Sequence, residues 1–204
     1  FTALKIQGPV TVLAAASLGS GASSTWAQGG IAAALGPDDS PELHAQDTEA
    51  AGAGIVDPTI IRLIAGEAPA RIDDLARLGV PFDRDGTGRF VLGREAAHSR
   101  NRIVRVTGDR AGAAIMAALI KAVRAEPRIK LLEGLIAYEL AIESGRVAGV
   151  YAHPIADKAA PVFIRADATI FALGGVGGLF EVTTNPPQAR GQGLGMAARA
   201  GAII

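Results

Sequence analysis

The stretch Ala168-Thr169-Ile170-Phe171-Ala172-Leu173-Gly174-Gly175-Val176-Gly177-Gly178 joins an apolar run directly to a cluster of glycines. The apolar run is typical of a strand buried in a parallel sheet. Nucleotides bind at the carboxyl ends of such strands, where these glycines stand. The full G-x-G-x-x-G spacing is missing, so a simple strand-to-loop turn is an alternative. The stretch predicts an α/β fold with a nucleotide site beside Gly174 and Gly175.

The remaining segments alternate helices and strands before a strand meander begins. Residues 9–13 are β-branched and mostly apolar, which predicts another parallel strand. Start signals at Ser40-Pro41 and Asp57-Pro58 predict helices over 41–51 and from 58 to Gly79, with Pro69 splitting or kinking the second. The other expected elements are a helix from a cap at Asp109 to about Ala125 and strands over 129–132, 136–142, 146–151 and 161–165, with a hairpin at Glu143-Ser144-Gly145. This pattern defines an α/β fold with an antiparallel excursion.

The composition excludes several classes of function. Lys and Arg number 20, as do Asp and Glu, so the chain lacks the basic field that nucleic acid requires. The absence of Cys rules out disulfides, thiolate nucleophiles and iron–sulfur sites. No apolar run reaches the roughly 18 residues of a membrane span, and no His and carboxylate pair has metal-site spacing. Glycine is in excess, at 26 of 204 residues against a usual share of about 7%, which predicts close approach of backbone to a ligand.

Both ends of the sequence are abrupt. It opens at Phe1 instead of Met, in a stretch that reads as the end of a helix, and it stops at Ile203-Ile204 after another helix. A cleaved signal peptide would also remove the methionine. We interpret residues 1–204 as an internal fragment, cut at both ends.

The densest chemical signal is Ser23-Ser24-Thr25-Trp26-Ala27-Gln28-Gly29-Gly30. Its hydroxyls and carboxamide exchange hydrogen bonds, its glycines let backbone N–H groups come close, and Trp26 offers a flat face. Such a loop suits a planar heteroaromatic ring or a phosphate. A surface loop of small polar residues is the alternative.

A second glycine-rich segment, Gly191-Gln192-Gly193-Leu194-Gly195, opens the last predicted helix. The N–H groups of this helix start are suited to an anion. Tight helix packing through small residues explains the segment equally well.

A charged cluster, Arg94-Glu95-Ala96-Ala97-His98-Ser99-Arg100, lies in a segment without periodicity. Glu95 and His98 are candidates to orient a charged substrate, with Arg94, Arg100 or Arg102 offsetting the carboxylate. A solvated polar loop is the alternative. The other histidines, His44 on an amphipathic helix and His153 in a turn, are expected at the surface.

Four motifs occur in one order along the chain. They are Ser-Ser-Thr-Trp-Ala-Gln-Gly-Gly-Ile-Ala-Ala-Ala at 23–34, Arg-Glu-Ala-Ala-His-Ser-Arg at 94–100, Ala-Leu-Gly-Gly at 172–175, and Thr-Thr-Asn-Pro at 183–186 with Gly-Gln-Gly-Leu-Gly-Met-Ala at 191–197. With these motifs the chain resembles the L-aspartate oxidases, a family within the succinate dehydrogenase and fumarate reductase flavoprotein superfamily. The resemblance covers essentially the whole chain.

The resemblance implies a Rossmann-like FAD-binding domain with a parallel sheet and an antiparallel β-meander, truncated at both ends. The first strand and its Gly-rich turn would precede Phe1, and the capping and C-terminal helical domains would follow Ile204. Such enzymes are cytoplasmic and oxidise L-aspartate to iminoaspartate, with oxygen or fumarate as the electron acceptor. This is the first step of de novo NAD biosynthesis, and it implies hand-over of the product to quinolinate synthase.

The resemblance also assigns roles to residues. Residues 23–30 would wrap the flavin, and Ile136 and Ala137 would give backbone contacts on the adenine side. Gly174, Gly175 and Gln192 are further candidates for cofactor contact, although relatives carry Asp where this chain has Gln192. Glu95 would meet the substrate ammonium, since a carboxylate there favours an amino acid over a plain dicarboxylate. His98 is the second catalytic candidate.

Two alternatives stay open. A succinate dehydrogenase or fumarate reductase flavoprotein subunit usually carries a His, bonded covalently to the flavin, in the loop equivalent to residues 23–25. This chain has Ser-Ser-Thr there, which favours L-aspartate oxidase with non-covalent FAD. The other alternative is a non-catalytic α/β remnant that binds no flavin, and we expect the 204-residue chain by itself to be inactive.

Overall fold

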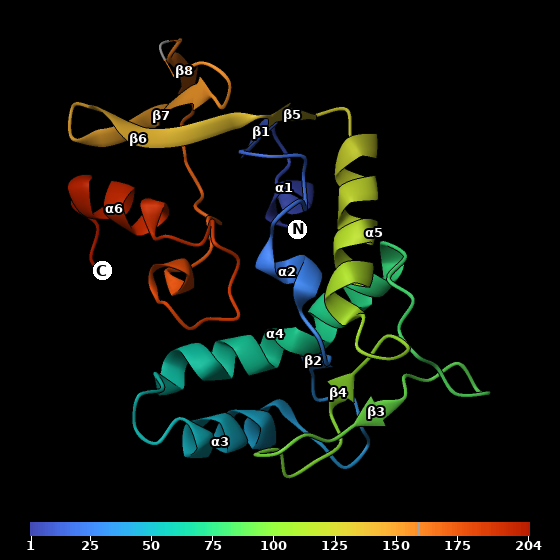
Figure 1. Cartoon of the computed structure of the whole chain (residues 1–204). Coiled ribbons are helices and arrows are strands. Elements are labelled where there is room, and N and C mark those ends of the chain that lie inside the picture. Colours follow the sequence, from blue (N-terminus) through green and yellow to red (C-terminus); the bar gives the residue numbers. More distant parts are fainter. Residues whose placement is uncertain (159) are drawn as a thin grey trace. The chain divides into compact units, whose positions relative to one another are not determined.

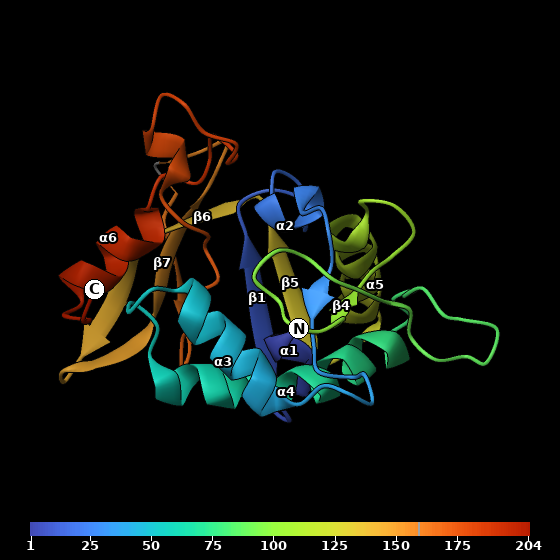
Figure 2. The same cartoon turned by 90° about the horizontal axis from the view of Figure 1, so that it is seen from below.

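A computed structural model describes residues 1–158 and 160–204, and their helices and strands confirm the α/β class (Figures 1 and 2). The chain divides into two compact units. The first comprises Phe1–Thr25 and Val123–Ile204, and the second comprises Trp26–Ala122. In the described part of the chain, no helix is both long enough and apolar enough to cross a membrane.

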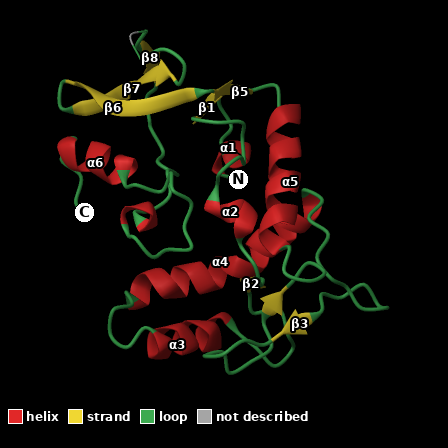
Figure 3. Ribbon diagram, in the orientation of Figure 1, coloured by secondary structure: helices red, strands yellow, loops and turns green. Residues whose placement is uncertain are grey.

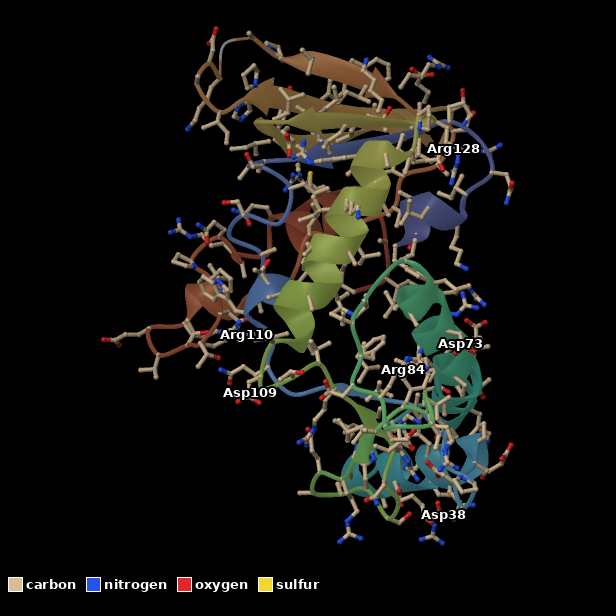
Figure 4. The ribbon with its side chains drawn as sticks, turned by 90° about the vertical axis from the view of Figure 1, so that its right-hand side faces the viewer. Asp38, Asp73, Arg84, Asp109, Arg110 and Arg128 are labelled. Atoms are coloured by element: carbon tan, nitrogen blue, oxygen red, sulfur yellow. The ribbon has the colours of Figure 1, made fainter. Side chains whose placement is uncertain are left out.

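The first unit contains a two-stranded parallel sheet. Strand β1 (Val10–Ala14) pairs in register with β5 (Ile129–Glu133), so that Val10 faces Ile129. Both strands were predicted. The short helix α1 (Thr2–Lys5) is fixed beside this sheet by Arg128, which donates hydrogen bonds to the carbonyls of Ala3, Leu4 and Ile6 (Figure 4).

The predicted meander forms a three-stranded antiparallel sheet in the order β6, β7, β8 (Figure 3). Its strands are β6 (Leu135–Glu143), β7 (Arg146–Pro154) and β8 (Val162–Arg165). Ser144 and Gly145 form the β6–β7 turn with φ of 51° and 74°, the pair of positive values that a tight right-twisted hairpin requires. His153, expected in a turn, lies on β7.

The strand predicted over 168–173 is wrong. Among the described residues this segment pairs with no neighbouring strand, and it runs as an irregular loop after β8 (Figure 3). A strand needs a backbone partner for its N–H and C=O groups, and apolar content alone does not supply one. Leu173 instead packs on Gly193, where an added Cβ would lie 2.9 Å from Leu173 Cδ1. The 3-10 turn η1 (Gly177–Leu179) and helix α6 (Gln192–Arg199) follow.

The second unit begins with two capped helices. Ser40 Oγ accepts from Leu43 N at 3.2 Å and starts α3 (Pro41–Ala51), while Asp57 starts α4 (Pro58–Arg77). Both starts were predicted from local signals. Pro69 does not split the helix, because α4 continues through it, and the alternative of a kink at Pro69 stays a prediction. Proline removes one N–H donor and its ring crowds the carbonyl four residues earlier, and the buried face around Ile72 offsets that cost.

A small antiparallel sheet and most of one long helix complete this unit. The sheet has the order β2 (Ile31–Ala32), β4 (Ile103–Val104), β3 (Leu92–Gly93), and its central strand is fully buried. Helix α5 (Ala111–Ala125) ends where predicted. The predicted cap at Asp109 is wrong. The first helical hydrogen bond runs from Ala114 N to Arg110 O, so Arg110 occupies the capping position and Asp109 lies one residue earlier (Figure 4).

Candidate functional site

The segment 23–30 is half helix and half loop. Residues Ser23–Trp26 form the single helical turn α2, where the sequence predicted a loop. Thr25 Oγ1 donates to Gly19 O at 2.9 Å, so this hydroxyl is committed to the fold. In the described part of the chain, the hydroxyls of Ser23 and Ser24 have no hydrogen-bond partner. Two of the three hydroxyls are therefore available to a ligand.

The glycines of this segment are required by close packing in the second unit. Gly29 has φ of +71°, which a side chain rarely adopts. A Cβ on Gly30 would lie 2.3 Å from Val104 O, so only glycine lets the loop lie against β4. The Gln28 amide makes no hydrogen bond to any described residue. Within the second unit, the exposed Gln28 thus lies on a backbone that packs against β4 at Gly30.

Glu95 lies next to this loop within the second unit. Its Oε1 is 3.4 Å from the position that a Cβ on Gly29 would take. The same oxygen accepts a hydrogen bond from Arg105 Nη2 at 3.2 Å. We expected Arg94, Arg100 or Arg102 to offset this carboxylate, and that expectation is wrong. Arg105 was missed because β3 and β4, which bring it near Glu95, are too short to show periodicity.

Arg102 has a different role, as the buried centre of a charge network. Its guanidinium binds Asp39 through two hydrogen bonds of 2.9 and 2.7 Å, and Asp47 through a third of 2.7 Å. The side chains of Arg102 and Asp39 are both 0% exposed. Despite burial, the two carboxylates raise the pKa of Arg102. The residues before Arg102 are tied to α3 because Ser99 donates to Asp47 through both its N–H and its hydroxyl.

The two histidines near this network are His98 and His44. His98 Nδ1 lies 3.3 Å from Arg102 Nη1, and its ring centroid is 5.8 Å from that of His44. Glu95 and His98 are joined through backbone, since His98 N donates to Glu95 O, but their side chains have different partners. His44, expected at the surface, is buried, because its helix packs that face against the charge network. Burial, and then the charge of Arg102, lowers the pKa of His44.

The first unit brings its two glycine clusters together. Gly191 N donates to Gly175 O at 3.1 Å, and Gly178 N donates to Ala189 O at 2.8 Å. Gly191 has φ of +74° and is the N-cap of α6, so Gln192 begins the helix at an exposed position. This confirms that the segment 191–195 opens a helix.

Ile136 and Ala137 of the predicted site also lie in the first unit, as does Gly21, which leads into α2. A Cβ on Gly21 would lie 3.6 Å from Gln188 Nε2, which places the chain leading into α2 beside the segment before α6. Ile136 and Ala137 lie on β6, the edge strand of its sheet. Their pairing with β7 is interrupted just after Ala137, where the register shifts. Within the described residues, this edge of β6 pairs with no further strand.

The donor set of these residues fits FAD. A dinucleotide needs hydrogen-bond donors for its phosphates and for the flavin edge, with backbone close enough to reach them. Among the described residues, the N–H groups of Gly29 and Gly174 make no hydrogen bond. A Cβ on Gly191 would lie 2.8 Å from Val176 Cγ1, so a close approach at the start of α6 requires glycine. Each unit therefore carries residues suited to the cofactor.

Comparison with known proteins shows the family of the chain. Residues 2–204 match the family described as FAD binding domain. An L-aspartate oxidase from Caulobacter vibrioides is 57% identical over 95% of this chain and 37% of its own length. One from Agrobacterium fabrum is 49% identical over 96% of this chain and 37% of its own length. The chain thus spans little more than a third of the curated relatives that it matches.

Solved structures with the same fold include Mycobacterium smegmatis Sdh1 in complex with UQ1. The TM-score is 0.88 at 29% sequence identity, and the match covers 94% of this chain and 34% of that one.

Proposed function

Since the chain belongs to the FAD-binding domain family, we propose that it forms part of an enzyme that oxidises L-aspartate to iminoaspartate. The similarity to L-aspartate oxidases confirms the resemblance that the sequence motifs predicted, and with it FAD as the cofactor. We further propose that this chain is part of a longer protein, which also contains a capping domain and a C-terminal helical domain. Such a protein would act in the cytoplasm, in de novo NAD biosynthesis, and deliver its product to quinolinate synthase.

The observation that carries the proposal is the place of Glu95. Its carboxylate lies against Gly29, in the loop whose free polar groups suit a flavin. FAD, when bound, supplies the electron acceptor for amine oxidation. The Glu95 carboxylate would bind the substrate ammonium and so orient the α-carbon. Residues 23–30, Gly174, Gly175 and Gln192 would hold the cofactor, with Ile136 and Ala137 contacting its adenine side through backbone.

The charge of Glu95 gives selectivity between substrates. A carboxylate attracts the ammonium of aspartate and repels a dicarboxylate that lacks it. Arg102 contacts His98 at the end of the turn that begins at Glu95. His98 would face the substrate as the second polar side chain of the 94–100 motif. Oxygen or fumarate would then take the electrons.

The proposal is tested with the full-length protein that contains this chain. It should be yellow and release hydrogen peroxide when aspartate is added. Glu95→Gln should raise the KM for aspartate much more than the KM for fumarate, because only aspartate carries an ammonium. Equal effects on both substrates would make Glu95 a structural residue, and a colourless protein without aspartate-dependent peroxide would refute the proposed function.

A flavoprotein subunit like Sdh1 is the second candidate, because the fold matches at a TM-score of 0.88. Ser-Ser-Thr at residues 23–25 offers no imidazole for a covalent bond to the flavin. Denaturing the holoenzyme with acid distinguishes the candidates. Flavin released into the supernatant supports non-covalent FAD, whereas flavin that stays with the precipitated protein supports the second candidate.

A further inference from the structure

The Glu95 carboxylate is held at one oxygen and free at the other. Oε1 accepts from Arg105 Nη2 at 3.2 Å and lies against Gly29. Among the residues that the structure describes, Oε2 accepts no hydrogen bond. The side chain is about half exposed, at 47%. Without a partner it would sample several rotamers, so the ion pair with Arg105 selects one orientation.

The Arg105 side chain is packed more closely than an ordinary surface ion pair requires. It directly follows β4, and a Cβ on Gly93 of β3 would lie 3.2 Å from both Cζ and Nε of the guanidinium. Arg105 Nε is buried and has no hydrogen-bond partner within the described residues. A buried donor left unpaired is unfavourable, while a half-exposed ion pair contributes little to stability. Stability alone therefore does not account for Arg105 at this position.

We propose that Arg105 is a positioning residue for Glu95. It fixes Oε1 against the loop at Gly29 and leaves Oε2 to accept a hydrogen bond from the substrate ammonium. This inference rests on the proposed function, in which Glu95 binds that ammonium. Arg105 acts on amine-containing ligands through Glu95, and it has no such effect on dicarboxylates without an amine.

The size of the effect follows from the freedom that Glu95 would regain. Ordering a Glu side chain removes rotamer freedom equivalent to about a tenfold change in affinity. Arg105→Gln removes the charge and shortens the side chain, so that the hydrogen bond from Nη2 to Glu95 is lost. We expect it to weaken binding of an amine ligand about tenfold and to change binding of succinate less than about twofold.

The experiment uses the full-length holoenzyme and two ligands that are not turned over. α-Methyl-L-aspartate keeps the ammonium but has no α-hydrogen to lose, and succinate lacks the ammonium. Calorimetry gives the Kd of each for wild-type, Arg105→Gln, Glu95→Gln and the double variant. Arg62→Gln serves as the matched control, because Arg62 forms an exposed ion pair with Glu49 elsewhere in the second unit. The control should leave both Kd values unchanged.

The double variant decides whether Arg105 acts through Glu95. In the Glu95→Gln background, Arg105→Gln should change the Kd of α-methyl-L-aspartate less than about twofold, because there is no carboxylate left to position. Arg105→Lys keeps the charge without the planar fork and should give an intermediate loss. It also serves as the test variant if Arg105→Gln does not fold.

Three results would overturn the inference. Equal weakening of both ligands would make Arg105 structural. A persistent tenfold effect in the Glu95→Gln background would mean that it acts without Glu95. Tighter binding of the amine ligand by Arg105→Gln would mean that Arg105 repels the ammonium. A Glu95→Gln variant that binds both ligands as wild-type does would instead refute the proposed role of Glu95.

Discussion

Replacing Arg102 with Met tests the buried charge network at its centre. Arg102 and Asp39 have fully buried side chains, and that of Asp47 is 17% exposed. The substitution keeps most of the side-chain volume and removes the cation. Asp39 would then be buried beside apolar groups with its counter-charge gone, and Asp47 would lose one of its donors.

The expected loss is large. Arg102 donates three charge-assisted hydrogen bonds, each worth about 1.5–3 kcal/mol, so their sum of about 4.5–9 kcal/mol is a ceiling for bonds that share one cation. Breaking a buried pair by removing one partner costs about 3–5 kcal/mol. We expect the free energy of unfolding to fall by about 3–5 kcal/mol, with the change confined to the second unit.

The assay is urea unfolding followed by far-ultraviolet circular dichroism, with amide hydrogen exchange of α3 as a local probe. Arg62→Met is the matched control, because it breaks an Arg–carboxylate pair whose side chains are 65% and 33% exposed. The control should cost less than about 1 kcal/mol. A loss for Arg102→Met within about 1 kcal/mol of the control would refute the reasoning, because the network would then contribute no more than a surface pair.

Three further substitutions have distinct expected outcomes. Gly66→Ala, in the interior of α4 with open space around it, should raise the free energy of unfolding by about 0.5–1 kcal/mol in urea. Gly30→Ala should instead lower it by about 1–3 kcal/mol, because its Cβ would overlap Val104 O, and a neutral result would show that the loop moves freely. Burial lowers the pKa of His44, so the stability that its neutral form supplies is complete above the ordinary pKa and is lost as the pH falls through the lowered folded-state value. His44→Leu should therefore reduce the fall in stability between about pH 7 and pH 5, and a slope equal to that of the wild-type protein would contradict the argument.

Locally encoded elements were predictable from the sequence. Helices α3 and α4 begin where Ser40-Pro41 and Asp57-Pro58 predicted, because a capping side chain and the proline that follows act within a few residues. The hairpin at Ser144 and Gly145 likewise needs only its own two positive φ values. In each case the physical cause lies inside the segment that carries the signal.

Some features that depend on a distant partner were not predictable, although β1 and β5, which pair with each other, were. The apolar segment 168–173 has the composition of a strand but no strand beside it in the described chain. His44 reads as a surface residue until Arg102, far away in sequence, is known to lie next to its helix. Arg105 reaches Glu95 only because two-residue strands pair, and such strands are too short to show a period of two.

The charges of the 94–105 segment divide into two functions that the sequence shows as one cluster. Arg102 is neutralised by the buried carboxylate of Asp39 and the partly exposed carboxylate of Asp47. Together with Ser99 it anchors the end of the turn. Arg105 instead pairs with the exposed carboxylate at the start of the turn, Glu95. A rigid anchor restricts the backbone of the turn, but it leaves the Glu95 side chain free to rotate. Fixing the backbone and orienting the carboxylate therefore require two different arginines, one buried for stability and one half-exposed beside Gly30.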